Sequence, residues 1–203
     1  MSLRDAVLAA LLEGESSGYD LAKGFDASVA NFWMATPQQL YRELERLAEQ
    51  GLIQARIVHQ ERRPNKRMFS LTEAGREAIR QFTRKSPKPS VIRDELMVKV
   101  QAADAGDGAA VRCFIIERLE WAGAKVQRYE RLRNRLLDGR SEAEYLATAQ
   151  RVGPYLTLMR GISFEEENIR WATRALAIIE QRQGAASVSS GRVQGRHAET
   201  KKL

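Results

Sequence analysis

Polar side chains that can contact nucleic acid recur on one side of a short predicted helix. Gln38, Gln39 and Arg42 are spaced by three and four residues, so a helix brings them to one polar face. Amide and guanidinium groups near a helix N-terminus can hydrogen-bond base edges and phosphates in a major groove. The pattern therefore predicts a DNA-reading surface, with Thr36 and Tyr41 close to the DNA backbone. An ordinary amphipathic surface helix has the same periodicity, so this segment alone does not decide the function.

A second charged group follows in a predicted turn. It contains four cations, Arg62, Arg63, Lys66 and Arg67, around a Pro-Asn pair that favours a turn. Each cation can neutralise a phosphate and release a counterion. We expect these residues to hold phosphates or to enter the minor groove. Cationic turns are often only solvated, so the turn gains its meaning from the helix before it.

The helix that carries the polar face has strong terminal signals. Thr36 suits the N-cap, Pro37 suits the first helical position, and Gln39 completes a capping box. Gln39 cannot cap Thr36 and read a base with the same amide. If the cap forms, Gln38 and Arg42 carry the base specificity. The apolar stripe that buries this helix consists of Leu40, Leu44 and Leu47.

Two predicted strands and a further helix complete the N-terminal part. Ile53, Ala55 and Ile57 alternate with polar residues, and Phe69 and Leu71 do the same on the return strand. Thr72 then caps the next helix. Tyr19 lies in the N-terminal turn of an earlier predicted helix, where it contacts either the DNA backbone or only the core. A helix with a polar N-terminus followed by a cation-tipped hairpin is the order of a winged helix-turn-helix. The predicted fold class is mainly α, with this winged helix first and an all-helical dimerisation domain after it.

Composition shifts divide the chain into four parts. We predict a winged-helix DNA-binding domain over residues 1–85 and a proline-containing linker over 86–90. A helical dimerisation domain follows over 91–182, and a disordered basic tail covers 183–203. Within the helical domain, Gly161 should end one helix, and Ser163 with Glu166 should cap the last one.

A heptad-like apolar seam runs along the longest predicted helix, from about residue 109 to 137. Such a seam suits an antiparallel neighbour or a partner subunit, and we favour the partner because the domain is small. Burial within the same domain is the alternative. The residues expected to form the dimer are Ile115, Leu119, Ala122, Val126, Tyr129, Leu136, Ile169, Trp171 and Leu176.

The composition argues against several other classes of protein. The net charge is +7, which is compatible with a nucleic-acid partner. A single cysteine, Cys113, suits a reducing compartment, and the absence of a signal-peptide pattern or long apolar run predicts a soluble cytoplasmic protein without a membrane partner. Two histidines, His59 and His197, cannot form a spaced metal site with one cysteine. We expect no enzyme activity, no metal and no cofactor.

Several segments resemble the PadR-like family of transcriptional regulators. Residues 39–53 are similar to its recognition helix, residues 63–75 to its wing and following helix, and residues 17–21 to the start of its second helix. Residues 158–161 and Trp171 fall where longer family members have similar residues.

The resemblance implies a homodimeric regulator, a repressor, that binds an inverted-repeat operator in double-stranded DNA. It also implies that the helical domain forms the dimer and can couple an effector to the wings. Some family members respond to small aromatic compounds, although no residue here assigns such an effector. Trp121, Trp171 and Tyr155 could line a pocket or only the core. The alternatives are a winged-helix protein-interaction module and a non-specific architectural DNA binder.

Overall fold

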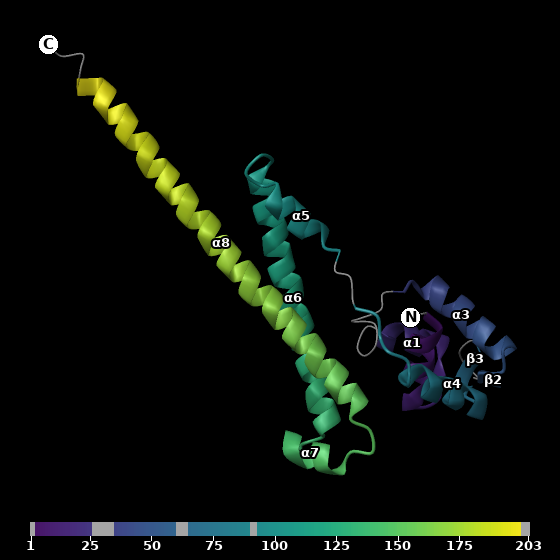
Figure 1. Ribbon diagram of the computed structural model, residues 1–203. Coiled ribbons are helices and arrows are strands. Elements are labelled where there is room, and N and C mark those ends of the chain that lie inside the picture. The colour runs from purple at the N-terminus through teal and green to yellow at the C-terminus, as the bar shows by residue number, and fades with distance from the viewer. Residues whose placement is uncertain (1–2, 26–34, 60–64, 90–92, 200–203) are drawn as a thin grey trace. The chain divides into compact units, whose positions relative to one another are not determined.

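The computed structural model describes residues 3–25, 35–59, 65–89 and 93–199 (Figure 1). These residues are mainly helical, as predicted, with one small antiparallel sheet. In chain order the elements are α1 (Leu3–Ala10), the 3₁₀ helix η1 (Leu11–Glu13), β1 (Ser16–Ser17), α2 (Gly18–Phe25), α3 (Pro37–Glu49), β2 (Ile53–Val58), β3 (Lys66–Leu71), α4 (Glu73–Thr83), α5 (Glu95–Gln101), α6 (Gly108–Leu137), α7 (Glu142–Thr148) and α8 (Gly153–Glu199).

The chain divides into two compact units. The first contains residues up to Ser90 together with Arg135–Met159, and the second contains Val91–Asn134 and the residues from Arg160 onward. The helices α6 and α8 therefore each contribute residues to both units.

The sheet of the first unit has the strand order β1-β3-β2. The hairpin has the predicted strands, with Ile53 opposite Leu71 and Val58 opposite Lys66. The short strand β1 was not expected, and it pairs Ser16 with Phe69. Two residues carry no alternating pattern, so only their pairing with β3 makes them a strand. The inward alternation predicted for β2 holds at Ile53 but not at Ile57, which is exposed near the wing tip.

Helix α3 forms where its caps predict. The Thr36 side chain accepts a hydrogen bond from the Gln39 backbone N–H at 3.2 Å, and the Gln39 Oε1 accepts one from the Thr36 N–H at 2.9 Å. Gly51 ends the helix with a φ of 67°, a left-handed conformation that favours glycine. The stripe that anchors the helix in the core of the first unit comprises Leu40, Leu44 and Leu47, all buried.

Helix α4 packs closely on the turn between α3 and β2. The Thr72 side chain accepts from the Gly75 N–H at 3.1 Å, as predicted for an N-cap, and its hydroxyl donates to the Gly51 carbonyl at 2.7 Å. A Cβ atom at Gly75 would lie 2.1 Å from the Leu52 carbonyl oxygen, so only glycine fits here. The wing and α4 are thereby fixed to the C-terminal end of α3. With α1 and α2 preceding α3, this is the predicted winged helix-turn-helix.

Helices α6 and α8 run antiparallel in the second unit (Figure 1). Arg112 of α6 pairs with Glu180 of α8 at 2.9 Å, and Lys125 pairs with Glu165 at 2.8 Å. The apolar contact between the two helices centres on the fully buried Ile115 and Ala172. Leu96 of α5 covers the same cluster.

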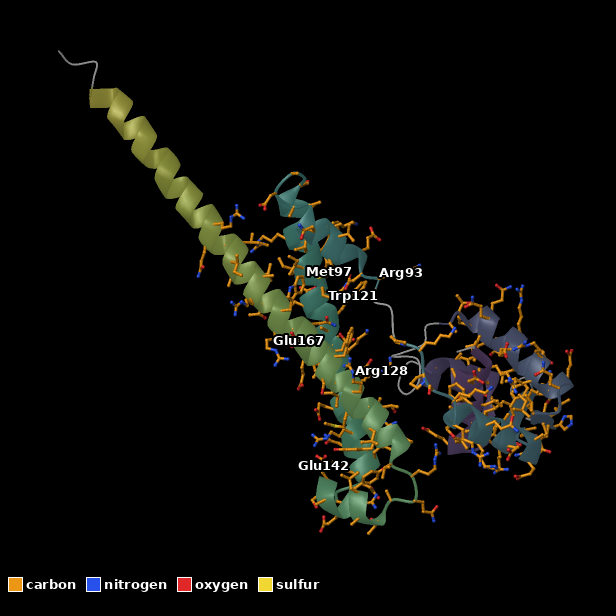
Figure 2. The ribbon with its side chains drawn as sticks, viewed as in Figure 1. Arg93, Met97, Trp121, Arg128, Glu142 and Glu167 are labelled. Carbon is orange, nitrogen blue, oxygen red and sulfur yellow. The ribbon has the colours of Figure 1, made fainter. Side chains whose placement is uncertain are left out.

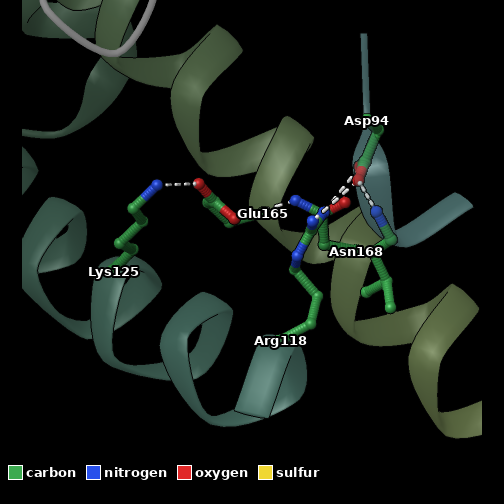
Figure 3. Close-up of polar contacts among 6 residues, drawn as sticks. Asp94, Arg118, Lys125, Glu165 and Asn168 are labelled. Atoms are coloured by element: carbon green, nitrogen blue, oxygen red, sulfur yellow. Dashed lines mark hydrogen bonds and ion pairs between the residues drawn. The ribbon is translucent and has the colours of Figure 1, made fainter. Parts of the chain in front are cut away.

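Glu165 is a buried carboxylate in this helix pair, only 4% exposed. It accepts hydrogen bonds from Lys125 Nζ and, at 2.9 Å, from Asn168 Nδ2 (Figure 3). Nearby, the Arg118 guanidinium donates two hydrogen bonds to Asp94, at 2.9 and 3.0 Å. These polar links fix the alignment of α6 with α8 and with the start of α5.

Helix α8 corrects two predictions about its course. Gly161 does not end a helix, and Ser163 with Glu166 does not cap a new one, because α8 is continuous from Gly153. An interior glycine costs a helix about 1 kcal/mol, which burial of neighbours such as Ile162 can offset. The helix also continues to Glu199, where a disordered tail was expected from residue 183. Extending an existing helix costs much less than starting one, which accounts for the difference.

Candidate nucleic-acid interface

The exposed face of α3 presents Gln38 and Arg42 one helical turn apart. Gln39 also lies at the surface, but its side-chain oxygen is used by the capping box. The capping box therefore forms at Gln39, and Gln38 and Arg42 remain the predicted base contacts of this face.

The two arginines of α3 differ in their partners. Arg46 donates to Glu43 at 2.6 and 3.2 Å, and these hydrogen bonds raise the pKa of the Arg46 guanidinium above its usual value. Across the described parts of the chain, no carboxylate pairs with Arg42. Its five N–H donors are therefore available to a phosphate or to the O6 and N7 acceptors of guanine.

Tyr41 and Tyr19 lie at the junction of α2 and α3. The Tyr41 ring packs over Gly18, where a Cβ atom would lie 2.4 Å from the ring carbon Cε1. This contact sets how closely the N-terminus of α2 approaches α3. Tyr19 is 64% exposed, and Tyr41 keeps part of its ring at the surface. Thr36, at the cap, lies at the same end of α3.

The wing cations that the structure describes are already engaged by carboxylates. Lys66 Nζ lies 2.7 Å from Asp20 Oδ2, and Arg67 forms an ion pair with Glu45 of α3. The Arg67 guanidinium also lies over the Phe69 ring, 5.1 Å from its centroid. The other two predicted wing cations, Arg62 and Arg63, lie outside the described residues.

Sequence reasoning missed the acidic partners of these cations. Lys66, followed by Ser17, lowers the pKa of the Asp20 carboxyl, and Arg56 lowers that of Glu15 through two hydrogen bonds at 2.5 and 2.6 Å. Ser17 Oγ accepts from the Asp20 N–H at 3.1 Å and donates to its carboxylate at 2.7 Å. The Ser-x-x-Asp spacing could have revealed Ser17 as a cap with the Asp20 carboxylate beside it. No local pattern relates Asp20 to Lys66, 46 residues away.

The predicted dimer seam is largely covered by its own chain. Ile115, Ala122 and Tyr129 are buried, so they cannot contact a second subunit unless the helices around them separate. Ile115 packs with Ala172 of α8 in one apolar cluster, as the alternative of burial within the same domain predicts, and the dimer role of the set stays a prediction. The remaining members of the set are partly buried, namely Leu119, Val126, Leu136, Ile169, Trp171 and Leu176.

The three aromatic residues considered for a pocket differ in burial: two lie in the core and one is exposed. Tyr155 is buried with its ring 5.4 Å from that of Tyr145, and Trp171 packs on the core between α6 and α8. Trp121 is 70% exposed on α6, near Met97 of α5 in the view of Figure 2. It borders an open cleft of about 320 Å³ between α5 and α6 that also includes Phe114.

Residues 3–25, 35–59, 65–89 and 93–199 contain neither a candidate metal site nor a candidate membrane span. In these ranges no three His, Cys, Asp or Glu side chains gather in an arrangement that could hold a metal ion. None of the described helices combines the length and apolar character needed to cross a bilayer.

Family comparisons match the two halves of the chain separately. The model of the "Transcriptional regulator PadR-like family" matches residues 7–81, and that of "Virulence activator alpha C-term" matches residues 92–180. The first match covers α2, α3 and the wing, and the second covers α5, α6 and much of α8.

Individual relatives match over nearly the full length. "Probable transcriptional regulator Rv1176c" of Mycobacterium tuberculosis is 29% identical over 192 residues, which is 90% of this chain and 100% of that protein. "Negative transcriptional regulator PadR" of Bacillus subtilis is 27% identical over 180 residues, 88% of this chain and 98% of that protein.

Solved structures of the Bacillus subtilis protein are also similar. The crystal structure in complex with operator DNA has a TM-score of 0.66 and 28% identity, and covers 87% of this chain and 98% of that one. The complex with p-coumaric acid has a TM-score of 0.63 and 26% identity, and covers 88% of this chain and 95% of that one.

Proposed function

We propose that the chain is a member of the PadR-like family of transcriptional regulators and acts as a homodimeric repressor that binds operator DNA. The observation that carries this proposal is the capped helix α3, with Gln38 and Arg42 on its exposed face and the wing beside its C-terminal half. The Bacillus subtilis relative in complex with operator DNA supports it.

Helix α3 enters the major groove in this proposal. Gln38 and Arg42 read base edges, because Gln39 is committed to the cap. The groups that contact the DNA backbone and fix the register are Tyr19, Thr36, Tyr41, Arg62, Arg63, Lys66 and Arg67. Two base-reading side chains give little discrimination, so a second subunit is needed. A dimer would span half-sites about 34 Å apart on an inverted repeat.

The dimer forms through the helical residues after residue 90, which the second family model covers. Since Ile115, Ala122 and Tyr129 are buried within the chain, the partly exposed Val126 and Ile169 are better placed to meet a partner. Substituting these two residues by aspartate should yield monomers in sedimentation experiments while leaving the helical content unchanged.

We extend the proposal to a small aromatic effector that relieves repression. The relative crystallised with p-coumaric acid supports this step. In this chain the cleft beside Trp121 and Phe114 is the first place to test, because its aromatic walls suit a planar ligand. We propose no enzyme activity and a cytoplasmic location, in keeping with a family of regulators.

Selection of bound fragments from a random duplex pool by the purified protein tests the function. The expected result is an inverted repeat. Arg42→Ala should then weaken binding to the selected sequence about 10- to 100-fold and relax the base preference at one position in each half-site. Arg46→Ala is the matched control, because Arg46 is already paired with Glu43.

The selection also separates the alternatives. Weak binding that enriches no sequence and falls steeply with salt would indicate an architectural DNA binder. Failure to retain any duplex at low salt would indicate a protein-interaction module and would refute the proposal.

A further inference from the structure

We propose that Glu45 is a specificity-determining residue, which reads the amino group of a cytosine when α3 lies in the major groove. This inference rests on the proposed function and adds an acidic residue to the predicted reading surface. The carboxylate is held ready by Arg67 of the wing, with which it forms an ion pair.

Glu45 lies on the same stripe of α3 as Gln38 and Arg42. It follows Gln38 by seven residues, which is nearly two full helical turns, so the two side chains project in almost the same direction. The separation along the axis is about 10 Å, which corresponds to about three base pairs. A helix that lays Gln38 against one base edge therefore brings Glu45 near another base a few steps along.

The pair with Arg67 shows that this side of α3 faces the wing. Glu45 and Arg67 remain about half exposed, with 51% and 44% of their side-chain surfaces accessible. The Arg67 guanidinium lies over the Phe69 ring, and Phe69 is buried in the core, so the cation has a fixed support. Glu45 is thus oriented from the wing side rather than left to move freely on the helix surface.

An isolated carboxylate near DNA would be repelled by phosphates, and Arg67 removes that difficulty. A guanidinium has five N–H donors, so Arg67 can keep one edge on Glu45 and turn another toward a phosphate. The pair then enters the groove with little net charge. Arg67 contacts Oε1 of Glu45, so Oε2 remains to accept a hydrogen bond from a base.

The carboxylate accepts hydrogen bonds only, which limits the bases that it tolerates. Cytosine presents its N4 amino donor in the major groove, whereas guanine presents two acceptors and thymine presents an acceptor and a methyl group. Adenine also presents an amino donor, N6, but its N7 acceptor lies beside that donor and would repel the second carboxylate oxygen. A guanine or thymine opposite Glu45 would leave the carboxylate unpaired and facing like charge. Glu45 should therefore favour one C·G pair in each half-site and oppose other sequences.

Asp20 supplies a matched control. It also holds a wing cation, Lys66, and is similarly exposed, but it lies at the start of α2 rather than on the reading stripe. Asp20→Asn and Glu45→Gln change the net charge equally. Only Glu45→Gln should alter which base is preferred.

The experiment repeats the duplex selection with wild type, Glu45→Gln and Asp20→Asn, all as full-length protein. With Glu45→Gln, the motif should lose its preference for cytosine at one position of each half-site. Affinity for the wild-type motif should fall about 5- to 100-fold relative to affinity for a scrambled duplex. Asp20→Asn should keep the motif and bind both duplexes about two- to five-fold more tightly. Thermal unfolding of each variant verifies that the fold is retained.

Two results would overturn the inference, and they differ in what they imply. If Glu45→Gln selects the same motif as wild type, Glu45 does not read a base, although the proposed function stands. If wild type itself enriches no sequence, the proposed function and this inference fail together.

Discussion

The winged helix and the α6–α8 pair hold their backbones together by different means. In the winged helix, two glycines occupy positions where a Cβ atom would collide with a neighbour: Gly75 meets the Leu52 carbonyl and Gly18 meets the Tyr41 ring. In the helix pair, a Cβ atom at Gly123 would meet nothing within 4 Å, and polar links such as Lys125 to Glu165 fix the alignment. The surface proposed to read DNA therefore lies on the region in which glycine positions tolerate larger side chains less well.

Replacing glycine by alanine should change the free energy of unfolding in opposite directions in the two regions, and this is the largest effect that we expect. Gly75→Ala forces the Leu52 carbonyl and α4 apart and should lower the free energy of unfolding by about 1–3 kcal/mol. Gly123→Ala, within helix α6 and without a steric conflict, should raise it by about 0.5–1 kcal/mol. Urea unfolding of both variants measures the difference. If both variants are stabilised, the close approach at Gly75 does not limit the winged helix.

A second prediction concerns the polar links of the helix pair. Lys125→Met leaves the buried Glu165 carboxylate without its ammonium partner and should cost about 1–2 kcal/mol, limited by the exposure of Lys125. Arg170→Met breaks an exposed pair with Glu167 on the same helix α8 and should cost less than about 0.5 kcal/mol. If both variants lose the same free energy of unfolding, burial of Glu165 does not strengthen its ion pair with Lys125.

The sequence predicted best what depends on nearby residues. Thr36 and Thr72 act as caps where expected, because each cap involves a backbone N–H only three residues away. The two strands of the hairpin were also predicted, since their alternation and the turn between them are local.

The errors arose where distant residues decide the outcome. Strand β1 exists through its pairing with β3, and the pairs of Lys66 with Asp20 and of Arg67 with Glu45 join residues remote in sequence. The sequence also left open which helix covers the seam around Ile115, and in the structure Ile115 packs with Ala172 of α8. A heptad pattern indicates that a face is buried without saying which helix buries it. For the same reason, Gly161 resembles a helix end until its packing is known.

The smallest predicted effect depends on pH and involves Asp94, which caps α5 and pairs with Arg118. Hydrogen bonds from Arg118 lower the pKa of the Asp94 carboxyl below its ordinary value of 3.8. A carboxyl with a lowered folded-state pKa stabilises the fold above its unfolded pKa, and this contribution is lost as the pH falls through the folded value.

Asp94→Asn retains a capping side chain but loses the ion pair. The free energy of unfolding of wild type should therefore exceed that of the variant by about 1 kcal/mol or less at pH 7. That difference should shrink as the pH falls below about 4. Asp104→Asn, which breaks an exposed pair with Arg182, is the control and should have a smaller effect at pH 7. Urea unfolding at pH 7 and pH 3 measures both differences. A gap in the free energy of unfolding between wild type and Asp94→Asn that stays constant with pH would show that the stabilisation does not come from the charge of Asp94.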